Sequence, residues 1–509
     1  MLVFKKFIIV LSLYAGLASA GILPVGRPDT DYAYRNLREL YLRGFETAPS
    51  ALYAPFDYLD IQALSDNNRP HSAGRLTTFL KRTANRFEAE TGFLDFQTTI
   101  IPSGTSGDKA GQSNLMFMPE FIYRISDTWS VQAAYRIDGS LADDSLYTGK
   151  VWGDFAGYAE LALLSFRGKR LSLDLGRTRD FWGASRSGYG LMRSSAAMPM
   201  DGMLLNYNFG DKLSLYSTIA YLSPVSSRSP FAADTLTENR YYSAHALRIS
   251  PFSWWDIILK ESVIYGGVGR QLEPKYIIPF ILYHGEQLNA NVDDNTFLGL
   301  ESVIRLKNRY AFYLELLVDD YQIENKSIFD NEPSEIGLII GANVYDFPFE
   351  MGAIEIEYTH IANHTYNQVK PRNIYINQGN PIGHPRGPDQ EGLSLSYIYH
   401  YDDYLTTEIT GYLINRGEGR LADDWETPWL DQDYIVKFPS GFVERRRGVS
   451  LEIFCAKNEI IQGKMLINMT DIQNNGNISG INEFTWSARL EIILNLPKLS
   501  WRLHDEKQH

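Results

Sequence analysis

The stretch RYAFYLELLVDDYQ, from Arg309 to Gln322, decides the fold because apolar side chains recur at every second position. The apolar face carries Tyr310, Phe312, Leu314, Leu316 and Val318. Glu315 and Asp319 fall on the other face. Because successive side chains of a strand point to opposite faces, this period of two predicts a strand with one apolar and one polar face.

The same alternation continues along the chain from about residue 93 onward. It is clearest in MGAIEIEYTHI (351–361), GVSLEIFCAK (448–457) and FTWSARLEIILNL (484–496). Further runs of this kind lie at 129–137, 158–166, 171–175, 212–221 and 406–413. Turn-rich segments such as FRGKR and RLKNR separate the runs, and no long helical pattern interrupts them. A soluble sandwich would also alternate, but not in a series of this length, so we predict one large sheet.

The first twenty residues have the three parts of a secretory signal peptide. Lys5 and Lys6 form the basic start, FIIVLSLYAGLA is the apolar centre, and ASA at 18–20 is the small-residue cleavage site. The mature chain is then expected to begin at Gly21. No later stretch approaches the ~18 apolar residues that a membrane-spanning helix needs. The best of them, YIIPFILY, is short and interrupted by a proline.

An exported sheet of this size is expected to close into an outer-membrane β-barrel. Lipid does not tolerate unpaired sheet edges. Alternating faces and abundant tyrosine, of which the chain has 32, are typical of such barrels. Membrane strands of about 10 residues with long external loops divide the length into roughly 16–18 strands.

Residues 21–92 follow a different pattern and are expected to form a small helical unit. DTDYAYRNLRELYLRGF (29–45) offers Asp29 or Thr30 as a helix cap and has an acidic first turn. SAGRLTTFLKRTANRFEAETG (72–92) places apolar residues on one helical face. The predicted organisation is therefore a signal peptide at 1–20, a helical unit at 21–92 and a barrel at 93–509.

Composition excludes several classes of protein. The chain has 48 Lys and Arg against 61 Asp and Glu, a formal net charge of −13, which argues against nucleic acid as a partner. Its single cysteine, Cys455, allows no disulfide and no cysteine-based metal site within one chain. The polar strand faces are acidic, at Glu315, Asp319, Glu355, Glu357, Glu408, Glu452 and Glu491. An acidic lumen would disfavour the passage of anionic solutes.

The segment LGRTRDFWGASRSGYGLMRSS (175–195) gathers cations, two aromatic rings and glycines in this acidic chain. An arginine side chain is a rigid fork that binds carboxylates and hydroxyls in pairs. Phe181 and Trp182 offer flat faces for sugar rings, so the segment fits a polyhydroxylated or acidic ligand. The alternative is a basic connection between two strands. Strict alternation would place Arg177 and Arg179 on the lipid side, unless the strand has ended or a bulge near Gly176 shifts the register.

Four segments resemble the Wzi-like capsule-assembly outer-membrane proteins, in the same order. LGRTRDFWGASRSGYGLMRSS is similar to the family's Gly-Arg…Trp-Gly-Pro-Gly segment, although Ala184 and Ser185 stand where the family often has Pro-Gly. HGEQLNANVDDNTFLGLE (284–301), YAFYLELLVDDYQ (310–322) and GNPIGHPRGPDQEGL (379–393) resemble three further family segments. The chain ends in RLHDEKQH and not on the terminal aromatic residue common in such barrels.

The resemblance implies an all-β transmembrane barrel of about 18 antiparallel strands with a small N-terminal α-helical plug at its periplasmic end. It also implies a lectin-like, non-enzymatic role in which the protein holds capsular or other surface polysaccharide at the bacterial outer membrane. The partners are then polysaccharide, outer-membrane lipid and, as a further expectation, the polysaccharide export machinery. No cofactor is expected. The candidate ligand-binding residues are Arg177, Arg179, Phe181, Trp182, Arg186, Asp319, Gln322, His384 and Asp389.

Two other functions are open on the sequence alone. A diffusion porin or other channel with an acidic lumen would have an open pore, whereas the binding role predicts a lumen occupied by helices and inward loops. An outer-membrane enzyme would need a catalytic constellation near a rim, but His360 and His364 lie at a strand end and no nucleophile is marked. The acid pairs Asp293-Asp294 and Asp319-Asp320 do not have the spacing of a calcium loop, so no metal site is expected.

Overall fold

The computed structural model describes residues 22–25, 27–45, 52–56, 61, 71–87, 92–105, 112–185, 187–228, 235–320, 334–425 and 437–501. The predicted signal peptide lies outside these residues, as do Arg186 and Gln322.

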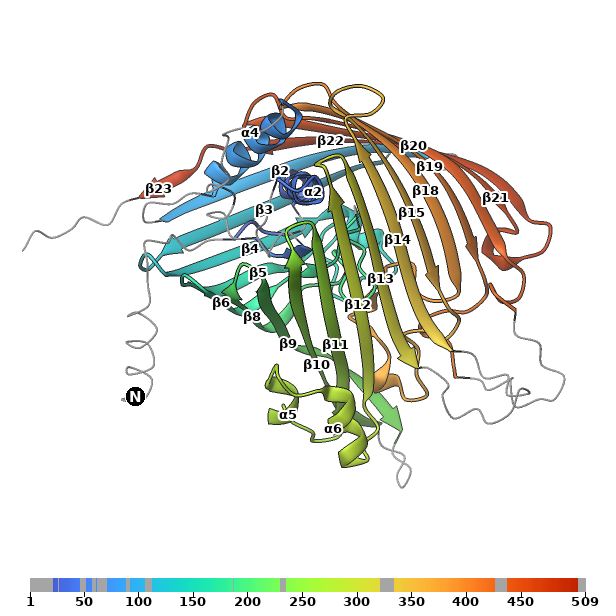
Figure 1. The fold of residues 1–509 in the computed structure, drawn as a ribbon. Helices are drawn as coiled ribbons and strands as arrows, with labels where there is room; N and C mark the ends of the chain where they lie inside the picture. The colour runs from blue at the N-terminus through green and yellow to red at the C-terminus, as the bar shows by residue number, and fades with distance from the viewer. Residues whose placement is uncertain are drawn as a thin grey trace, which may run out of the picture.

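Eighteen antiparallel strands close into a barrel within the described residues (Figure 1). They are β2 (Gly92–Thr105), β3 (Gln112–Arg124), β4 (Trp129–Asp138), β5 (Ala156–Arg167), β6 (Leu171–Thr178), β8 (Met200–Gly210), β9 (Leu213–Arg228), β10 (Thr235–Phe252), β11 (Trp255–Gly267), β12 (Asn295–Leu306), β13 (Tyr310–Asp320), β14 (Glu335–Tyr345), β15 (Gly352–Ile361), β18 (Gln390–His400), β19 (Leu405–Arg416), β20 (Glu444–Cys455), β21 (Ile461–Gln473) and β22 (Asn482–Asn495). The prediction of a closed antiparallel barrel of about 18 strands is confirmed.

The barrel closes where its first and last strands meet. β2 pairs with β22 over Gln97–Thr105, and the short β23 (Leu499–Trp501) continues the last strand past Pro497 to pair with Gly92–Leu94. The missing N–H of proline explains why the ladder is interrupted there. The last strand is thus paired up to Trp501.

The two ends of the barrel differ in the length of their connections. The turn end is formed by the short connections 125–128, 168–170, 211–212, 253–254, 307–309, 346–351, 401–404 and 456–460. The loop end carries the long connections, among them 139–155, 179–199, 268–294, 362–389 and 417–443. In outer-membrane barrels short turns face the periplasm and long loops face outward.

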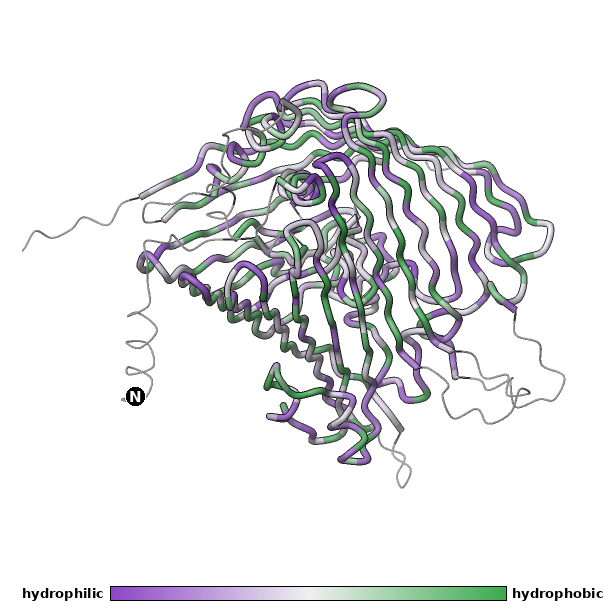
Figure 2. Tube along the Cα trace, viewed as in Figure 1, coloured by the Kyte–Doolittle hydropathy of each residue, from purple (hydrophilic) through white to green (hydrophobic). Residues whose placement is uncertain are grey.

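The alternating residues sort between lipid and lumen as the sequence predicts. In β13, Phe312 and Tyr310 are exposed on the outer face, whereas Glu315 is buried in the lumen. Figure 2 shows hydrophobic and hydrophilic positions alternating along the strands. The lumen face also carries apolar side chains such as Tyr313 and Leu317, which pack in the interior core.

The N-terminal segment contains two helices, both close to where they are expected. α2 (Pro28–Leu42) crosses the lumen, and α4 (His71–Arg86) lies at the turn end (Figure 1). Pro28 opens α2, where its fixed φ is favourable and its missing N–H costs nothing. Gly44, with φ +81°, follows its end. None of the described helices has the length and apolar character needed to span a bilayer.

Two loops from the loop end complete the interior. Loop 179–199 contains β7 (Phe181–Trp182), which pairs with β1 (Tyr53–Ala54) of the N-terminal segment. Loop 362–389 contains the 3-10 turn η3 (Pro371–Asn373) and a hairpin of β16 (Ile376–Asn377) and β17 (Asn380–Pro381). One hydrophobic core joins side chains of α2, both loops and the barrel wall, for example Tyr41, Trp182 and Tyr375. Such an occupied lumen is what the binding role predicts.

Candidate functional site

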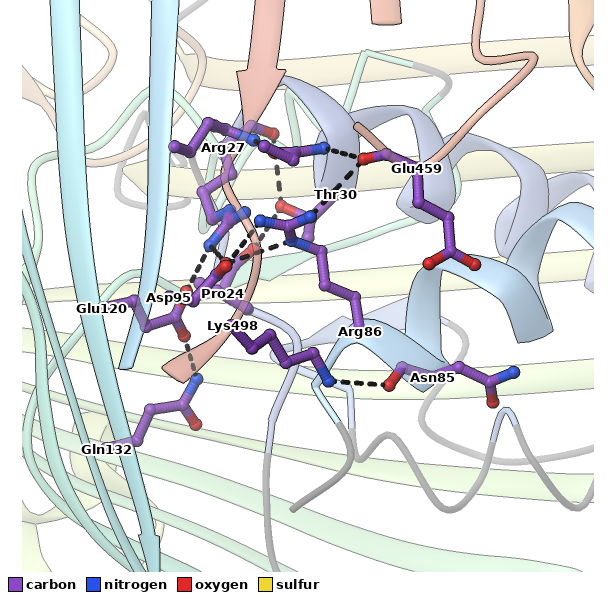
Figure 3. Close-up of polar contacts among 12 residues, drawn as sticks. Pro24, Arg27, Thr30, Asn85, Arg86, Asp95, Glu120, Gln132, Glu459 and Lys498 are labelled. Atoms are coloured by element: carbon purple, nitrogen blue, oxygen red, sulfur yellow. Dashed lines mark hydrogen bonds and ion pairs between the residues drawn. The ribbon is translucent and has the colours of Figure 1, made fainter. Parts of the chain in front are cut away.

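The acidic lumen wall is bound to arginines of the N-terminal segment. Arg27 contacts Asp95 of β2, with 3.2 Å between Nη1 and Oδ2, and Glu120 of β3. Arg86 of α4 donates to the same Asp95 carboxylate, at 3.0 Å from Nε and 2.5 Å from Nη2. Gln132 donates to Glu120 at 2.6 Å, and Figure 3 shows the whole cluster. Charge-assisted contacts of this kind are the strong hydrogen bonds of proteins.

Further arginines on α2 pair with other parts of the wall. Arg35 contacts Glu452 at 2.8 Å and Arg38 contacts Glu355 at 3.1 Å. Burial alone would lower the pKa of Arg38, but Glu355 raises it above its ordinary value. The other lumen carboxylates named above also have partners, with Glu315 beside Lys260, Glu357 beside Tyr313, Glu408 beside Arg35, Asp319 beside the Tyr366 amide and Glu491 beside Arg489. Glu355, Glu408, Glu452 and Asp319 therefore bind the plug and the inward loops, whereas Glu357 and Glu491 are paired within the wall.

The arginines of segment 175–195 lie on opposite sides of the barrel wall. Arg177 is partly exposed on the outer face of β6 and makes two hydrogen bonds, of 2.7 and 2.5 Å, to Asp201. Arg179 follows the end of β6, is buried and donates to Glu160 at 2.8 Å. Arg186 is outside the described residues. Of the two predicted arginines that the structure describes, Arg179 is the one that lies in the interior.

Loop 179–199 is held against the plug by its aromatic pair. Trp182 is buried, with its ring 5.5 Å from that of Tyr53. The Phe181 ring lies 5.5 Å from that of Tyr34 on α2. The Gly183 amide also donates to the Leu52 carbonyl at 2.9 Å. These rings pack in the interior and form the base of the loop.

A buried cluster of charges fixes the same loop to the wall. Lys260 Nζ lies 2.6 Å from Glu301 Oε2 and 2.9 Å from Glu315 Oε1. Glu301 accepts from the Ala184 amide at 2.9 Å, and Glu315 accepts from the Leu191 amide at 3.1 Å. The two carboxylates thus share one cation and hold two points of the loop backbone.

The second inward loop rests on the first. The Tyr366 hydroxyl donates to the Leu191 carbonyl at 2.6 Å, and the Tyr375 hydroxyl donates to the Met192 carbonyl at 2.8 Å. Asp319, a predicted site residue, accepts from the Tyr366 amide at 2.6 Å. Asp319 therefore holds the backbone of the second inward loop.

His384 and Asp389 are buried in the loop structure. Asp389 has φ +59° and accepts from the Gly419 amide, the Ser440 amide and the Ser440 hydroxyl at 2.8, 2.9 and 2.6 Å. It joins loop 362–389 to loop 417–443. The His384 ring packs edge-on against Tyr189 with 5.9 Å between ring centres. Both residues organise the loop end of the barrel.

Two histidines, the buried His384 and the half-buried His364, are expected to make the stability of loop 362–389 depend on pH. Burial lowers the pKa of His384 well below its usual value, and Arg386 adds to the shift. Burial also lowers the pKa of His364, against the effect of Asp389 and Asp423. Since the folded-state pKa lies below the unfolded value of about 6.5, the stabilisation is present above that pH and lost as pH falls. We expect hydrogen-exchange protection of this loop to fall between about pH 7.5 and pH 5.5.

Replacing both histidines tests this expectation. His384→Gln combined with His364→Gln should make the protection factors of loop 362–389 nearly independent of pH, while the strands serve as an internal control. An unchanged pH dependence in the double variant would contradict the assignment.

A pocket at the loop end was not predicted from the sequence. Its volume is about 420 Å³, and its wall combines rings with polar groups. The lining residues are Leu141, Asp144, Leu146, Tyr147, Thr148, Gly149, Lys150, Trp152, Gly157, Tyr158, Met198, Gln378 and Asn380. Trp152 is 54% exposed, so its ring is available to a ligand. We call this site the outer pocket.

The outer pocket is assembled from three separate connections. Residues 141–152 come from the connection between β4 and β5, Met198 comes from loop 179–199, and Gln378 and Asn380 come from the β16–β17 hairpin. The hairpin turns through Gln378 and Gly379, both with positive φ, as a two-residue turn requires. The tip lies so close to the first connection that a Cβ on Gly379 would be 2.9 Å from the Leu146 carbonyl oxygen.

Arg179 links the predicted segment to the outer pocket. Its Nη2 donates to the Tyr158 hydroxyl at 3.3 Å, and its Nη1 donates to the carbonyls of Ser195, at 3.1 Å, and Ala197. Tyr158 and Met198 both line the pocket. Arg179, which supports the pocket, is among the residues predicted from the sequence, whereas Trp152 is not. The only local signal for Trp152 is an aromatic residue in the polar, glycine-containing stretch YTGKVWGDF (147–155).

No catalytic or metal-binding arrangement stands out among the described residues. His360 packs on Phe438, and His364 packs on Trp425. Asp294 pairs with Arg270, with 2.8 Å between Oδ2 and Nη2. No cluster of three His, Cys, Asp or Glu side chains in the described part of the chain could hold a metal ion.

Comparison with known proteins agrees with this architecture. The family model "Capsule assembly protein Wzi" matches residues 108–432. The solved structure of Wzi from Escherichia coli, an outer membrane protein involved in group 1 capsule assembly and described as a carbohydrate-binding β-barrel, is 13% identical. The match covers 95% of this chain and 100% of that chain, with a TM-score of 0.64. Pseudomonas aeruginosa OccD3 (OpdP) is 11% identical, with 80% and 92% of the two chains covered and a TM-score of 0.47. No curated protein matches the chain.

Proposed function

Because the chain belongs to the Wzi capsule assembly family, we propose that this outer-membrane β-barrel holds capsular or other surface polysaccharide at its loop end, without enzymatic activity. The outer pocket carries the proposal. It lies among the long connections, and its exposed tryptophan ring stands beside hydrogen-bonding side chains. Small-ligand sites commonly combine ring faces with a few placed polar groups.

The chemistry of the outer pocket suits a sugar residue. The flat face of Trp152 can cover the C–H face of a pyranose ring, because aromatic rings bind apolar surface with little loss of conformational freedom. Asp144, Gln378 and Asn380 offer acceptors and donors for hydroxyl groups. Lys150 adds a cation that suits a carboxylate-bearing sugar.

In this proposal, most of the residues predicted from the sequence support the outer pocket instead of lining it. Arg179 positions the pocket through Tyr158 and the carbonyls of 195 and 197. Phe181, Trp182, Asp319, His384 and Asp389 build the inward loops on which the pocket rests. Arg177, on the outer face of the wall, has Asp201 as its partner. Direct ligand contact by these residues, and contact with the export machinery, remain predictions.

A direct binding measurement tests the proposed function. The refolded full chain in detergent or lipid should bind surface polysaccharide purified from the same cells in calorimetry or surface plasmon resonance. Fragments of a few sugar residues should compete, because the outer pocket holds only a short segment of a polymer. A neutral polymer such as dextran is the control. Equal binding of both polymers, or binding of neither, would contradict the proposal.

A further inference from the structure

The helices α5 (Pro274–Ile277) and α6 (Tyr283–Ala290) lie outside the barrel, beside β10, β11 and β12 (Figure 1). Beneath them is a hydrogen-bonding pair, a histidine and a glutamate, on the outer face of the wall. His245 of β10 is opposite Glu261 of β11 in the strand register, with 3.2 Å between Nε2 and Oε2. The neighbouring Lys260 points the other way, into the lumen. Both members of the pair are buried, although they are on the lipid-facing side.

The position of this pair along the strand places it within the apolar band. Exposed Phe252 and Trp254 mark the turn end of the β10–β11 hairpin, next to Trp255. Glu261 follows Trp255 by six residues, which is about 15 Å along the barrel axis for a strand rise of about 3.4 Å and a tilt of about 40°. The apolar band of such barrels is about 25 Å tall. An uncovered glutamate at this level would face lipid, which is unfavourable.

Helix α6 covers the pair and satisfies it. The backbone amides of Tyr283 and His284, at the start of α6, donate to Glu261 at 2.9 and 2.7 Å. The Tyr283 ring lies 4.5 Å from the His245 ring. The same helix is bound to β12, because the His284 ring contacts the Thr296 hydroxyl at 2.9 Å.

The connections on both sides of the helices are joined to each other, and α5 packs on the wall. Arg270 donates to Asp294 at 2.8 Å from Nη2, and Tyr276 donates to the same carboxylate at 2.7 Å. The Tyr276 ring packs 4.6 Å from Tyr265 of β11, in a small core that also contains Tyr241. The side of α5–α6 that faces the barrel is therefore held to β11 and β12 by hydrogen bonds and ring packing.

The opposite face of the unit is apolar and uncovered. Phe280 is 73% exposed, Leu282 71% and Leu288 66%, and Ile278 and Val268 are exposed as well. Figure 2 shows hydrophobic positions along this segment. The exposed apolar surface continues on the wall at Leu298 of β12, directly next to the covered positions. An exposed apolar patch of this kind marks an interaction surface.

We propose that α5–α6 is embedded in the outer leaflet of the outer membrane, with lipid acyl chains covering Phe280, Leu282 and Leu288. The occupant follows from continuity, because the patch extends the lipid-facing wall at the level of the covered His245–Glu261 pair. Phe280 and Leu282 lie in the connection between α5 and α6, and Leu288 lies on α6. Apolar side chains of segments that lie on a membrane enter the boundary between headgroups and acyl chains in this manner. The role is independent of polysaccharide binding and would fix the depth at which the loop end stands above the membrane.

Spin labelling at position 282 tests the proposal in the full chain. The single native cysteine is removed as Cys455→Ser, and Leu282→Cys is labelled with a nitroxide in protein refolded into phospholipid vesicles. Collision with oxygen, which concentrates in lipid, is compared with collision with a water-soluble nickel chelate. Leu298→Cys serves as the lipid-facing control, and Ile478→Cys, exposed in the connection between β21 and β22, serves as the water-facing control.

The expected result is an oxygen-to-chelate ratio at position 282 that is close to that at 298 and several-fold above that at 478. A ratio like that at 478 would overturn the proposal, because the connection between α5 and α6 would then stand in water. Low accessibility to both reagents would also overturn it and would indicate a second protein copy on this face. Because each label replaces an exposed side chain, all three variants should refold, which heat-modifiable electrophoretic mobility checks.

Discussion

Lys260→Ala is expected to lower the free energy of unfolding by about 3–5 kcal/mol, the cost of removing one partner from a buried ion pair. Lys260, Glu301 and Glu315 are almost completely buried, and the lysine is the shared cation of both carboxylates. Without it, two negative charges would lie close together away from water. Urea unfolding of the barrel in lipid vesicles measures the change.

The same substitution should loosen loop 179–199 before the barrel unfolds. Glu301 and Glu315 hold the Ala184 and Leu191 amides, so repulsion between the carboxylates acts directly on the loop backbone. Faster hydrogen exchange at those two amides would report this loosening.

A matched control uses a pair on the outer face. Arg177→Ala removes a partly exposed partner of Asp201 and should change the free energy of unfolding by at most about 1 kcal/mol. Lys260→Met with Glu301→Gln and Glu315→Gln removes the charges together and should recover part of the lost stability. Equal effects of Lys260→Ala and Arg177→Ala would show that the buried cluster has no special role.

The barrel could be predicted from the sequence because lipid imposes one simple rule on every strand. Phe312 faces lipid and Glu315 faces the lumen, and this alternation appears in the sequence as a period of two. The partners of the lumen carboxylates were not predictable, since Glu355 meets Arg38, 317 residues away in the chain. The acidic lumen was therefore predictable from the sequence, but the arginines of the plug that neutralise part of it were not.

The arginine segment shows where alternation stops being informative. Arg177 lies on the outer face, as strict alternation predicts, because it is still within β6. Arg179 turns inward because β6 ends at Thr178, and the chain then enters the loop. The end of β6 is set by its pairing with β8, because the last residue pair of the two strands is Thr178 with Met200, the first residue of β8. Two residues of the same type, two positions apart, therefore have different roles.

The outer pocket could not be predicted from the sequence for a similar reason. Its residues come from three connections that have no periodic pattern of their own, and the barrel topology alone brings them together. A loop tryptophan such as Trp152 has no distinguishing neighbours in the chain. Its significance comes from its exposure beside Gln378 and Asn380, more than 200 residues further along the chain.

Trp152→Ala should weaken polysaccharide binding about 30-fold, which corresponds to about 2 kcal/mol for the loss of an aromatic side chain at the centre of a binding site. Trp152 is 54% exposed and lines the outer pocket, and alanine leaves a ligand ring without a stacking partner. The affinity of the full chain for the purified surface polysaccharide, measured by calorimetry, gives the change. Trp152→Phe should retain most of the affinity because it keeps a flat ring.

Phe155→Ala is the matched control, since Phe155 is also exposed and bridges to Trp152 through the backbone but does not line the outer pocket. It should leave the affinity within about twofold. Both substitutions are at exposed positions and should change the free energy of unfolding by no more than about 0.5 kcal/mol, so a binding defect would not reflect misfolding. Unchanged affinity in Trp152→Ala would remove the outer pocket from the binding surface, and binding would then have to be sought elsewhere among the long connections.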